Sequence, residues 1–291
     1  MKPSPALSSI AVRRVDENVV DDVTDVLAVE EPLEIRLGFP DGSHRAISIT
    51  MRTPGDDGEL AAGFLFTEGL INQSEQIKQI RHCGLKIGKA RDTIERAAAL
   101  NSNTIRVDLN DGIDVDLKDI ERHFYTTSSC GVCGKSSIDA LKTGAVKLAH
   151  IDSPRIDAEL IRTLPERLRA SQSVFDQTGG LHASALFKTD GEMEIVREDV
   201  GRHNALDKVI GARFLAGSMP LSESILLVSG RASFELVQKA LMAGIPIMLA
   251  VGAPSSLAVE LATEFGMTLV GFVRNGSFNV YSGAERVTGF S

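Results

Sequence analysis

The residues best suited to chemistry are two cysteines, Cys130 and Cys133, in the segment CGVCG. A thiol reacts as its thiolate, and a cysteine with the usual pKa of about 8.5 is only about 3% ionised at pH 7. Lys135 and the N-terminus of a helix expected just after the motif would both lower that pKa. The flanking glycines leave the sulfur accessible to a large partner. The pair indicates sulfur transfer, redox chemistry or metal binding, and sulfur transfer is favoured.

Zinc binding is one alternative. A structural zinc ion usually has four ligands, and only the CGVCG pair has ligand spacing; Cys83, His182 and His203 would complete a site only through the tertiary fold. Zinc-dependent nucleobase deaminases have an H-x-E motif followed later in the chain by P-C-x-x-C. In this chain Ser184 occupies the position of the glutamate after His182, and the cysteine pair precedes the histidine. We therefore expect no resident metal and no deamination. A thioredoxin-like dithiol is a weaker alternative, because that motif follows the first strand of its domain.

Two glycine-bearing turns predict anion binding. They are LLVSGRASF (226–234) and LAVGAPSSL (249–257), and each resembles the end of a strand, a turn and the start of a helix. Free N–H groups and the helix dipole converge at the start of such a helix. Each turn alone is more consistent with an ordinary connector than with a ligand site, but two on neighbouring strands would line one edge of a sheet. The candidate residues are Ser229, Gly230, Arg231, Ser233, Gly252 and Ser255.

A third candidate is the run EDVGRHN, which places four ionisable residues in one turn before a helix. These are Glu198, Asp199, Arg202 and His203. A connector needs fewer charges, so we interpret the turn as functional and assign Arg202 and His203 to ligand binding.

These residues need elements to position them. Segments of alternating apolar and polar residues at 33–37 and 46–51, on either side of Asp41-Gly42, predict a hairpin. Acidic residues after Pro54 predict a helix, and residues 104–109 predict a further strand. We place a domain boundary near Tyr125. The second part alternates strands and helices: a hairpin at 182–196, a helix at 204–214, strands at 225–229, 245–251 and 268–273, and helices at 232–243 and 255–265. This pattern predicts a βαβαβ unit in a largely parallel sheet.

Composition limits the classes of function. The chain has 291 residues, typical of two domains, and its three cysteines are too few for a disulfide framework. A formal charge of −8 argues against nucleic acid as a partner. The first 125 residues hold 22 of the 39 acidic side chains but only 15 lysines and arginines, so this part is acidic. The remainder is nearly neutral and is therefore better suited to bind an anionic ligand. No apolar run approaches the length of a membrane span and no signal peptide is evident, so we expect a cytoplasmic protein.

Several longer segments carry a resemblance to a known family. Over about residues 30–285 the chain resembles the FdhD family of formate dehydrogenase accessory proteins. The segments that carry the resemblance are FYTTSSCGVCG, TGGLHASALF, REDVGRHNALDKVIG, SGRASFELVQKALMAGIP, GAPSSLAVELA and TPGDDGELAAGFLFTEGLI. The resemblance implies a sulfurtransferase. Such proteins take sulfane sulfur from a cysteine desulfurase as a cysteine persulfide and pass it to the molybdenum or tungsten of the bis(guanine dinucleotide) pterin cofactor, before the cofactor enters formate dehydrogenase.

The resemblance also implies particular residues and partners. By position, the persulfide falls on Cys130, with Cys133 as its auxiliary, and the cofactor-binding stretch is FVRNGS: Phe272, Val273, Arg274, Asn275, Gly276 and Ser277. From the residues alone, Arg274 to Gly276 would instead be a hairpin turn. The implied ligand is Mo-bis(molybdopterin guanine dinucleotide), which guanine nucleotides partly mimic. The implied partners are a cysteine desulfurase and the formate dehydrogenase apoenzyme, and homodimerisation is left open.

The implied fold is α/β. A cytidine-deaminase-like three-layer domain would span residues 126–291, after a smaller β-rich α+β domain over residues 1–125. A chaperone that only binds and hands over the molybdenum cofactor is the alternative function, in which the cysteines would be structural or regulatory.

Overall fold

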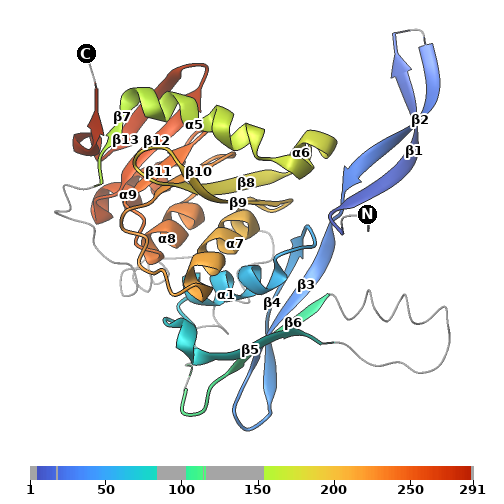
Figure 1. Ribbon diagram of the computed structural model, residues 1–291, viewed down its shortest axis with the longest axis vertical. Coiled ribbons are helices and arrows are strands. Elements are labelled where there is room, and N and C mark those ends of the chain that lie inside the picture. Colours follow the sequence, from blue (N-terminus) through green and yellow to red (C-terminus); the bar gives the residue numbers. More distant parts are fainter. Residues whose placement is uncertain (1–4, 18, 84–102, 114, 116–153, 290–291) are drawn as a thin grey trace.

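The computed structural model describes residues 5–17, 19–83, 103–113, 115 and 154–289 (Figure 1). Its largest sheet has six strands, in the order β13-β12-β11-β10-β8-β9. They are β8 (His182–Phe187), β9 (Met193–Asp199), β10 (Ile225–Val228), β11 (Ile247–Ala250), β12 (Thr268–Arg274) and β13 (Ser277–Ser282). Strands β10, β11 and β12 run parallel, whereas β8 and β13 pair antiparallel to their neighbours and β9 pairs antiparallel to β8. The sheet is therefore mixed.

Helices cover both faces of this sheet, which gives three layers (Figure 1). One face carries α5 (Ala158–Ala170) and α6 (Ser173–Thr178), and the other carries α7 (Arg202–Leu215), α8 (Phe234–Met242) and α9 (Ser256–Phe265). Alternate residues of each strand enter separate cores: Ile225 and Leu227 pack with α5, and Leu226 and Val228 pack with the α7 side. The buried parallel strands have continuous apolar sequences because both of their faces are covered.

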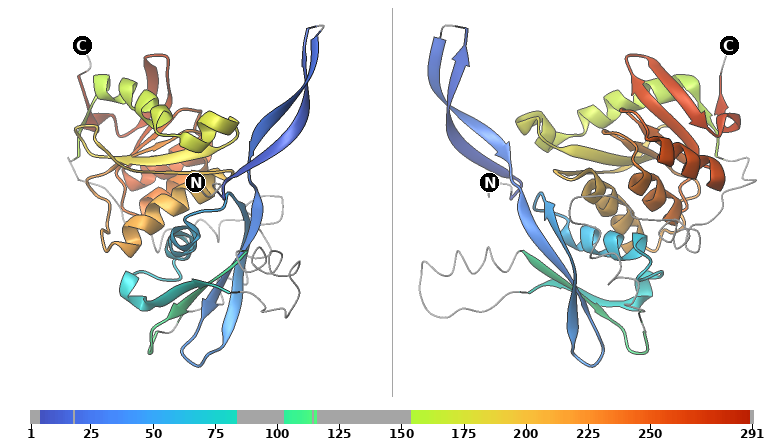
Figure 2. Two further views of the ribbon diagram at one scale, coloured as in Figure 1. Left: turned by 45° about the vertical axis from the view of Figure 1, so that its right-hand side comes forward. Right: turned by 180° about the vertical axis from the view of Figure 1, so that it is seen from behind.

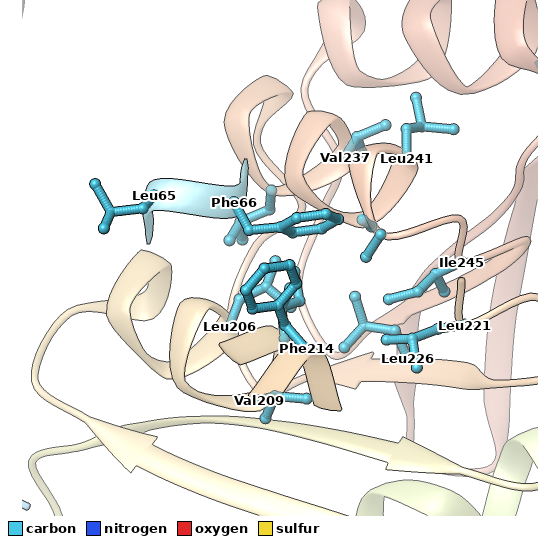
Figure 3. Close-up of a cluster of buried hydrophobic side chains, with 14 of the residues drawn as sticks. Leu65, Phe66, Leu206, Val209, Phe214, Leu221, Leu226, Val237, Leu241 and Ile245 are labelled. Atoms are coloured by element: carbon cyan, nitrogen blue, oxygen red, sulfur yellow. The ribbon is translucent and has the colours of Figure 1, made fainter. Parts of the chain in front are cut away.

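The N-terminal part is a second, smaller unit of strands and one helix. Its sheet has the order β4-β3-β6-β5, formed by β3 (Glu31–Gly38), β4 (His44–Arg52), β5 (Ile77–His82) and β6 (Thr104–Leu109). Helix α1 (Asp57–Thr67) lies between this sheet and α7, and the short helix η1 (Ser74–Gln76) leads into β5. The rings of Phe66 in α1 and Phe214 in α7 lie 4.9 Å apart within one continuous core (Figure 3).

Three small elements complete the fold. The hairpin β1 (Leu7–Asp16) and β2 (Val19–Ala28) extends away from the body (Figures 1 and 2). Near the other end of the chain, η2 (Ala284–Arg286) precedes β14 (Val287–Thr288), which pairs in parallel with β7 (Ile156–Asp157). None of the described helices is long and apolar enough to cross a membrane.

Most of the elements predicted from the sequence are confirmed, including both hairpins and the βαβαβ unit. The three-layer arrangement and the β-rich N-terminal unit also agree. The expectation of a largely parallel sheet is wrong at the flanks, because β8, β9 and β13 join through hairpins and antiparallel contacts. The boundary near Tyr125 lies outside the described residues, and the likeness to cytidine deaminase stays a prediction.

Candidate functional site

The two predicted anion-binding turns lie side by side at the carboxyl ends of β10 and β11. The amide of Gly252 donates to the carbonyl of Gly230 at 2.9 Å, and the amide of Phe272, at the end of β12, donates to the carbonyl of Gly252 at 3.0 Å. The two turns approach closely at position 252, because a Cβ there would lie 3.0 Å from both the Gly230 oxygen and Arg231 Cγ. The expected placement of both turns at one edge of the sheet is therefore confirmed.

The serines of these turns have structural partners. Ser229 Oγ accepts a hydrogen bond from the Ala183 amide at 2.9 Å, which joins the turn to β8. Ser255 Oγ accepts from the Ala258 amide at 3.2 Å and so caps α9. Each hydroxyl keeps its own proton for a further acceptor.

A groove runs along this edge on the α5–α6 side of the sheet. It consists of two pockets of about 500 and 550 Å³ that share Pro165, Arg169 and Val251 in their walls. We call them the Gln172 pocket and the Arg274 pocket. The Gln172 pocket is also lined by Leu168, Gln172, Phe175, Gly179, Gly180, Leu181, His182 and Ser229. The Arg274 pocket is also lined by Arg162, Glu166, Ala170, Asp176, Val273, Arg274, Asn275 and Gly276.

Gln172 is the most informative residue of the first pocket. It is only 4% exposed, yet its Nε2 has no hydrogen-bond partner within the described residues. Such a donor costs free energy when it is buried without an acceptor, and native proteins leave few of them. Because Gln172 is in the wall of the pocket, its amide is a candidate partner for a carbonyl oxygen of a ligand there.

His182 adds a second polar group to the same pocket. Burial lowers the pKa of its imidazole, and the positive charge of Arg202 lowers it further, against an opposing effect of Asp199. A Cβ at Gly230 would lie 3.3 Å from His182 Nδ1, so the glycine leaves room for the ring. The ring is thus biased towards its neutral form, which can both donate and accept a hydrogen bond.

The FVRNGS stretch forms the far end of the groove and is also a hairpin turn. Arg274 pairs with Ser277 across β12 and β13, and Asn275 and Gly276 have φ angles of 53° and 71°. The hairpin interpretation is therefore confirmed. The turn residues also line the Arg274 pocket, and cofactor binding by this stretch stays a prediction. Phe272 has a φ of 54°, which is unusual for an aromatic residue and is a feature of constrained functional sites.

Two arginines of the groove lie over aromatic rings. The guanidinium of Arg169 lies 4.3 Å from the centroid of the Phe175 ring, and that of Arg274 lies 5.3 Å from the Phe272 ring. Arg162 Nε donates to the Gly276 carbonyl at 3.0 Å, which fixes the turn against α5. Arginine and aromatic faces of this kind suit flat heterocycles and phosphates.

Arg202 and His203 lie near the start of α7, on the other side of the edge. His203 Nε2 is 3.4 Å from Ser233 Oγ and 3.9 Å from Glu235 Oε2. Burial, followed by the charges of Arg202 and Lys239, lowers the pKa of His203 to about 4. The buried Nε of Arg202 has no hydrogen-bond partner within the described residues.

The two acidic residues of the same motif have structural roles. Glu198 accepts hydrogen bonds from the amides of Val174 and Phe175 at 3.0 and 2.9 Å, and so caps α6. Asp199 is fully buried and lies 2.7 Å from Lys208 Nζ. The excess of charge in EDVGRHN is therefore partly explained by packing, and the roles assigned to Arg202 and His203 stay predictions.

The groove gathers some of the predicted residues but not all of them. Those that line it are Ser229, Val273, Arg274, Asn275 and Gly276. Other predicted residues belong to the same edge but do not line the two pockets: Gly230, Arg231, Ser233, Gly252, Ser255, Arg202 and His203. Cys130 and Cys133 lie outside the described residues, as does the helix expected after them. In the part of the chain that is described, no three His, Cys, Asp or Glu side chains gather as a metal site.

Comparison with known proteins assigns the family. The model of the FdhD/NarQ family matches residues 28–288. This chain belongs to the FdhD/NarQ family. Among its FdhD/NarQ relatives, the "Sulfur carrier protein FdhD" of Streptomyces avermitilis is 52% identical over 281 residues, which cover 95% of this chain and 94% of the relative. The protein of that name from Thermoplasma volcanium is 42% identical over 279 residues, again 95% and 94% of the two chains.

A solved structure extends the FdhD/NarQ comparison to the fold. A candidate formate dehydrogenase accessory protein from Desulfotalea psychrophila is 26% identical and superposes with a TM-score of 0.71, covering 98% of this chain and all of that one. The resemblance noted from the sequence motifs is thus confirmed.

Sequence reasoning missed one wall of the groove in this FdhD/NarQ protein. Helices α5 and α6, which carry Arg169 and Phe175 and flank Gln172, were not predicted. His182 was weighed only as a zinc ligand. Two signals were present. Ile161, Leu164 and Leu168 recur at helical spacing after a capping Asp157, and the family motif TGGLHASALF contains the pocket residues 179–182.

Proposed function

We propose that this FdhD/NarQ protein is a sulfur carrier in formate dehydrogenase maturation, which receives sulfane sulfur on Cys130 and delivers it to the pterin guanine dinucleotide cofactor bound in the groove. The names of its relatives support the carrier role. The observation that carries the binding half of the proposal is the unpartnered Gln172 donor inside a pocket at the carboxyl edge of the sheet. That edge is where open α/β sheets bind nucleotides.

The groove fits the chemistry of this substrate. A dinucleotide pterin needs a long site, and the two connected pockets provide one. The guanine and pterin rings each carry a carbonyl oxygen that can accept from Gln172 Nε2. Arg274 supplies a cation for a phosphate group, and the aromatic side chain of Phe175 lines the Gln172 pocket as a face for stacking.

The first sulfur transfer is balanced without an external oxidant or reductant. The thiolate of Cys130 attacks the outer sulfur of a persulfide on the desulfurase. A new S–S bond forms as the old one breaks, and the desulfurase cysteine leaves as a thiolate. The transferred sulfur keeps its oxidation state, so Cys130 ends as a persulfide whose outer sulfur is the atom available to the cofactor as substrate. Cys133 has an auxiliary role in this scheme.

A genetic experiment tests the proposal. Cys130→Ala, produced in a strain that lacks the native chain, should leave formate dehydrogenase inactive while the variant accumulates as folded protein. Cys133→Ala is the matched control and should retain more activity. Full activation of the dehydrogenase by the Cys130 variant would contradict the sulfur-carrier proposal.

A cofactor chaperone is the second candidate. Gln172, His182 and Arg274 in the described walls of the groove would bind the cofactor through hydrogen bonds and charge alone, without sulfur chemistry. Under the chaperone alternative, Cys130→Ala would activate the dehydrogenase as well as the unchanged chain does, whereas Gln172→Leu would not.

A further inference from the structure

The EDVGRHN motif contains two side chains that neither the groove nor the packing of the fold explains. These are Arg202 and His203, the first two residues of α7, which do not line either pocket. The pairing of β8 with β9 places His182 directly opposite Asp199, shortly before the chain enters α7. All three side chains therefore come from one corner of the sheet. We call His182, Arg202 and His203 the Arg202 cluster.

Arg202 is an unusual arginine because it is partly buried and has no partner. No carboxylate oxygen lies within 4.0 Å of its guanidinium among the described residues, and its buried Nε has no acceptor there. The buried or partly buried arginines Arg52 and Arg197, by contrast, pair with carboxylates at 3.0 and 2.6 Å. A buried donor without an acceptor costs free energy. The guanidinium of Arg202 is thus available to an anion.

The two imidazoles of the Arg202 cluster add neutral donors to this charge. Burial lowers the pKa of both rings, and the positive charge of Arg202 is the next cause in each case. Each ring is therefore biased towards its neutral form, which has one N–H donor and one acceptor. Ser233 Oγ lies 3.4 Å from His203 Nε2, whereas the ring of His182 has no hydrogen-bond partner in the described part of the chain.

The charges around the Arg202 cluster favour a monoanion as its ligand. Arg202 supplies one fixed positive charge, and the carboxylate of Glu235 opposes it from 3.9 Å beyond His203 Nε2. A dianion such as phosphate would be repelled by Glu235 and neutralised by only one cation. A metal cation would be repelled by Arg202. Because His182 also lines the Gln172 pocket, a monoanion held here would lie beside a ligand of the groove.

We propose that the Arg202 cluster binds a terminal sulfur anion, either hydrosulfide or the outer sulfur of a persulfide, beside the Gln172 pocket. The inference rests on the proposed sulfur-carrier function, which brings such a sulfur to this protein. The guanidinium neutralises the charge and the imidazoles donate to the sulfur. No bond forms or breaks while the anion is held. The EDVGRHN motif thus positions sulfur next to the groove and does not itself bind the cofactor.

An NMR titration of the full chain with sodium hydrosulfide, in the absence of oxygen, tests the site. It uses Cys130→Ala, so that no persulfide forms at that position. The ring-nitrogen signals of His182 and His203 should shift together and reach saturation. An absence of saturable shifts in both rings, here and in the loaded chain described below, would overturn the proposal.

Substitutions of Arg202 test its role in the same titration. Arg202→Gln should weaken hydrosulfide binding by about 10- to 150-fold, the range for one charge-assisted hydrogen bond. Arg202→Lys keeps the charge and should restore part of the affinity. Arg213→Gln is the matched control, since Arg213 lies in the last turn of the same helix and is 3.4 Å from Glu194. Equal affinities for Arg202→Gln and the control would also overturn the proposal.

Two further titrations identify the anion. A chain loaded by a cysteine desulfurase and then freed of sulfide should show the same histidine shifts if the sulfur is held as a persulfide, whereas shifts with hydrosulfide alone would assign the free ion. Inorganic phosphate that binds as tightly as hydrosulfide, with the same dependence on Arg202, would overturn the sulfur assignment. Because hydrosulfide binding needs no sulfur on Cys130, its outcome is independent of whether the carrier role itself fails.

Discussion

Gly63 in α1 and Gly211 in α7 lie back to back where the two helices cross. A Cβ on Gly63 would be 1.9 Å from the Asp207 carbonyl oxygen, and a Cβ on Gly211 would be 1.8 Å from that of Glu59. The first glycine belongs to the N-terminal unit and the second to the six-stranded unit. The two units are therefore joined by direct backbone packing at this crossing as well as by the shared core around Phe66 and Phe214.

Gly211→Ala should destabilise the protein strongly, because the new methyl group would meet backbone atoms that have no room to move. Overpacking of this kind costs about 1 to 3 kcal/mol, and backbone contact places the loss at the upper end. Gly58→Ala in α1 is the control, since its Cβ would make an ordinary 3.6 Å contact with Ile80. That change should be neutral or stabilising by up to about 1 kcal/mol. Urea unfolding measures both, and equal midpoints would contradict the close crossing.

The low pKa of His203 predicts a loss of stability in acid. The folded-state pKa of about 4 lies below the usual 6.5, so the unfolded chain binds this proton more readily. The stability that the neutral ring contributes is complete above about pH 6.5 and is lost as the pH falls towards about 4. His203→Gln should flatten this part of the stability profile, whereas His44→Gln, at an exposed position, should not. An NMR titration that charges His203 above pH 6 would refute the assignment.

Gln172→Leu separates binding from folding. The substitution removes an unpartnered buried donor, so the free energy of unfolding should stay constant or rise. Affinity for GDP, which mimics half of the proposed cofactor, should fall by about 2- to 12-fold, as expected for one lost neutral hydrogen bond. Calorimetry on the two proteins measures the difference. Unchanged affinity would remove Gln172 from the binding site.

The groove favours Arg274 over Arg231 as the phosphate ligand. Arg274→Ala should weaken GDP binding by about 10- to 150-fold, the range for a charge-assisted hydrogen bond, and Arg231→Ala should have little effect. The same titration distinguishes them. A larger loss for the Arg231 variant would place the nucleotide at the SGRAS turn instead, as the sequence motif alone suggested.

The predictable parts of this fold are those in which local sequence and tertiary context agree. The strands at 225–228 and 247–250 are continuous apolar runs that end in glycine turns, and the Asn275-Gly276 turn has a strong local preference for its positive φ angles. Helix α5 was harder to recognise because Pro165 and several arginines interrupt its apolar spacing.

The candidate site depends on contacts that no local pattern encodes. Gln172 is an ordinary polar residue in the sequence, and only the packing of α5, α6 and β8 buries its amide. The β1–β2 hairpin is similar, since alternating valines and charges do not indicate whether a strand pair lies in a sheet or extends from the body. By contrast, Cys130 was singled out by residue type and spacing alone, because reactive thiols are rare and chemically distinctive.

Intact-protein mass spectrometry tests directly whether Cys130 carries sulfur. The purified chain is incubated with a cysteine desulfurase and cysteine, then measured with and without a thiol reductant. We expect an added mass of one sulfur atom that the reductant removes, that persists in Cys133→Ala and that is absent in Cys130→Ala. The same added mass in the Cys130 variant, or none in the unchanged protein, would contradict it.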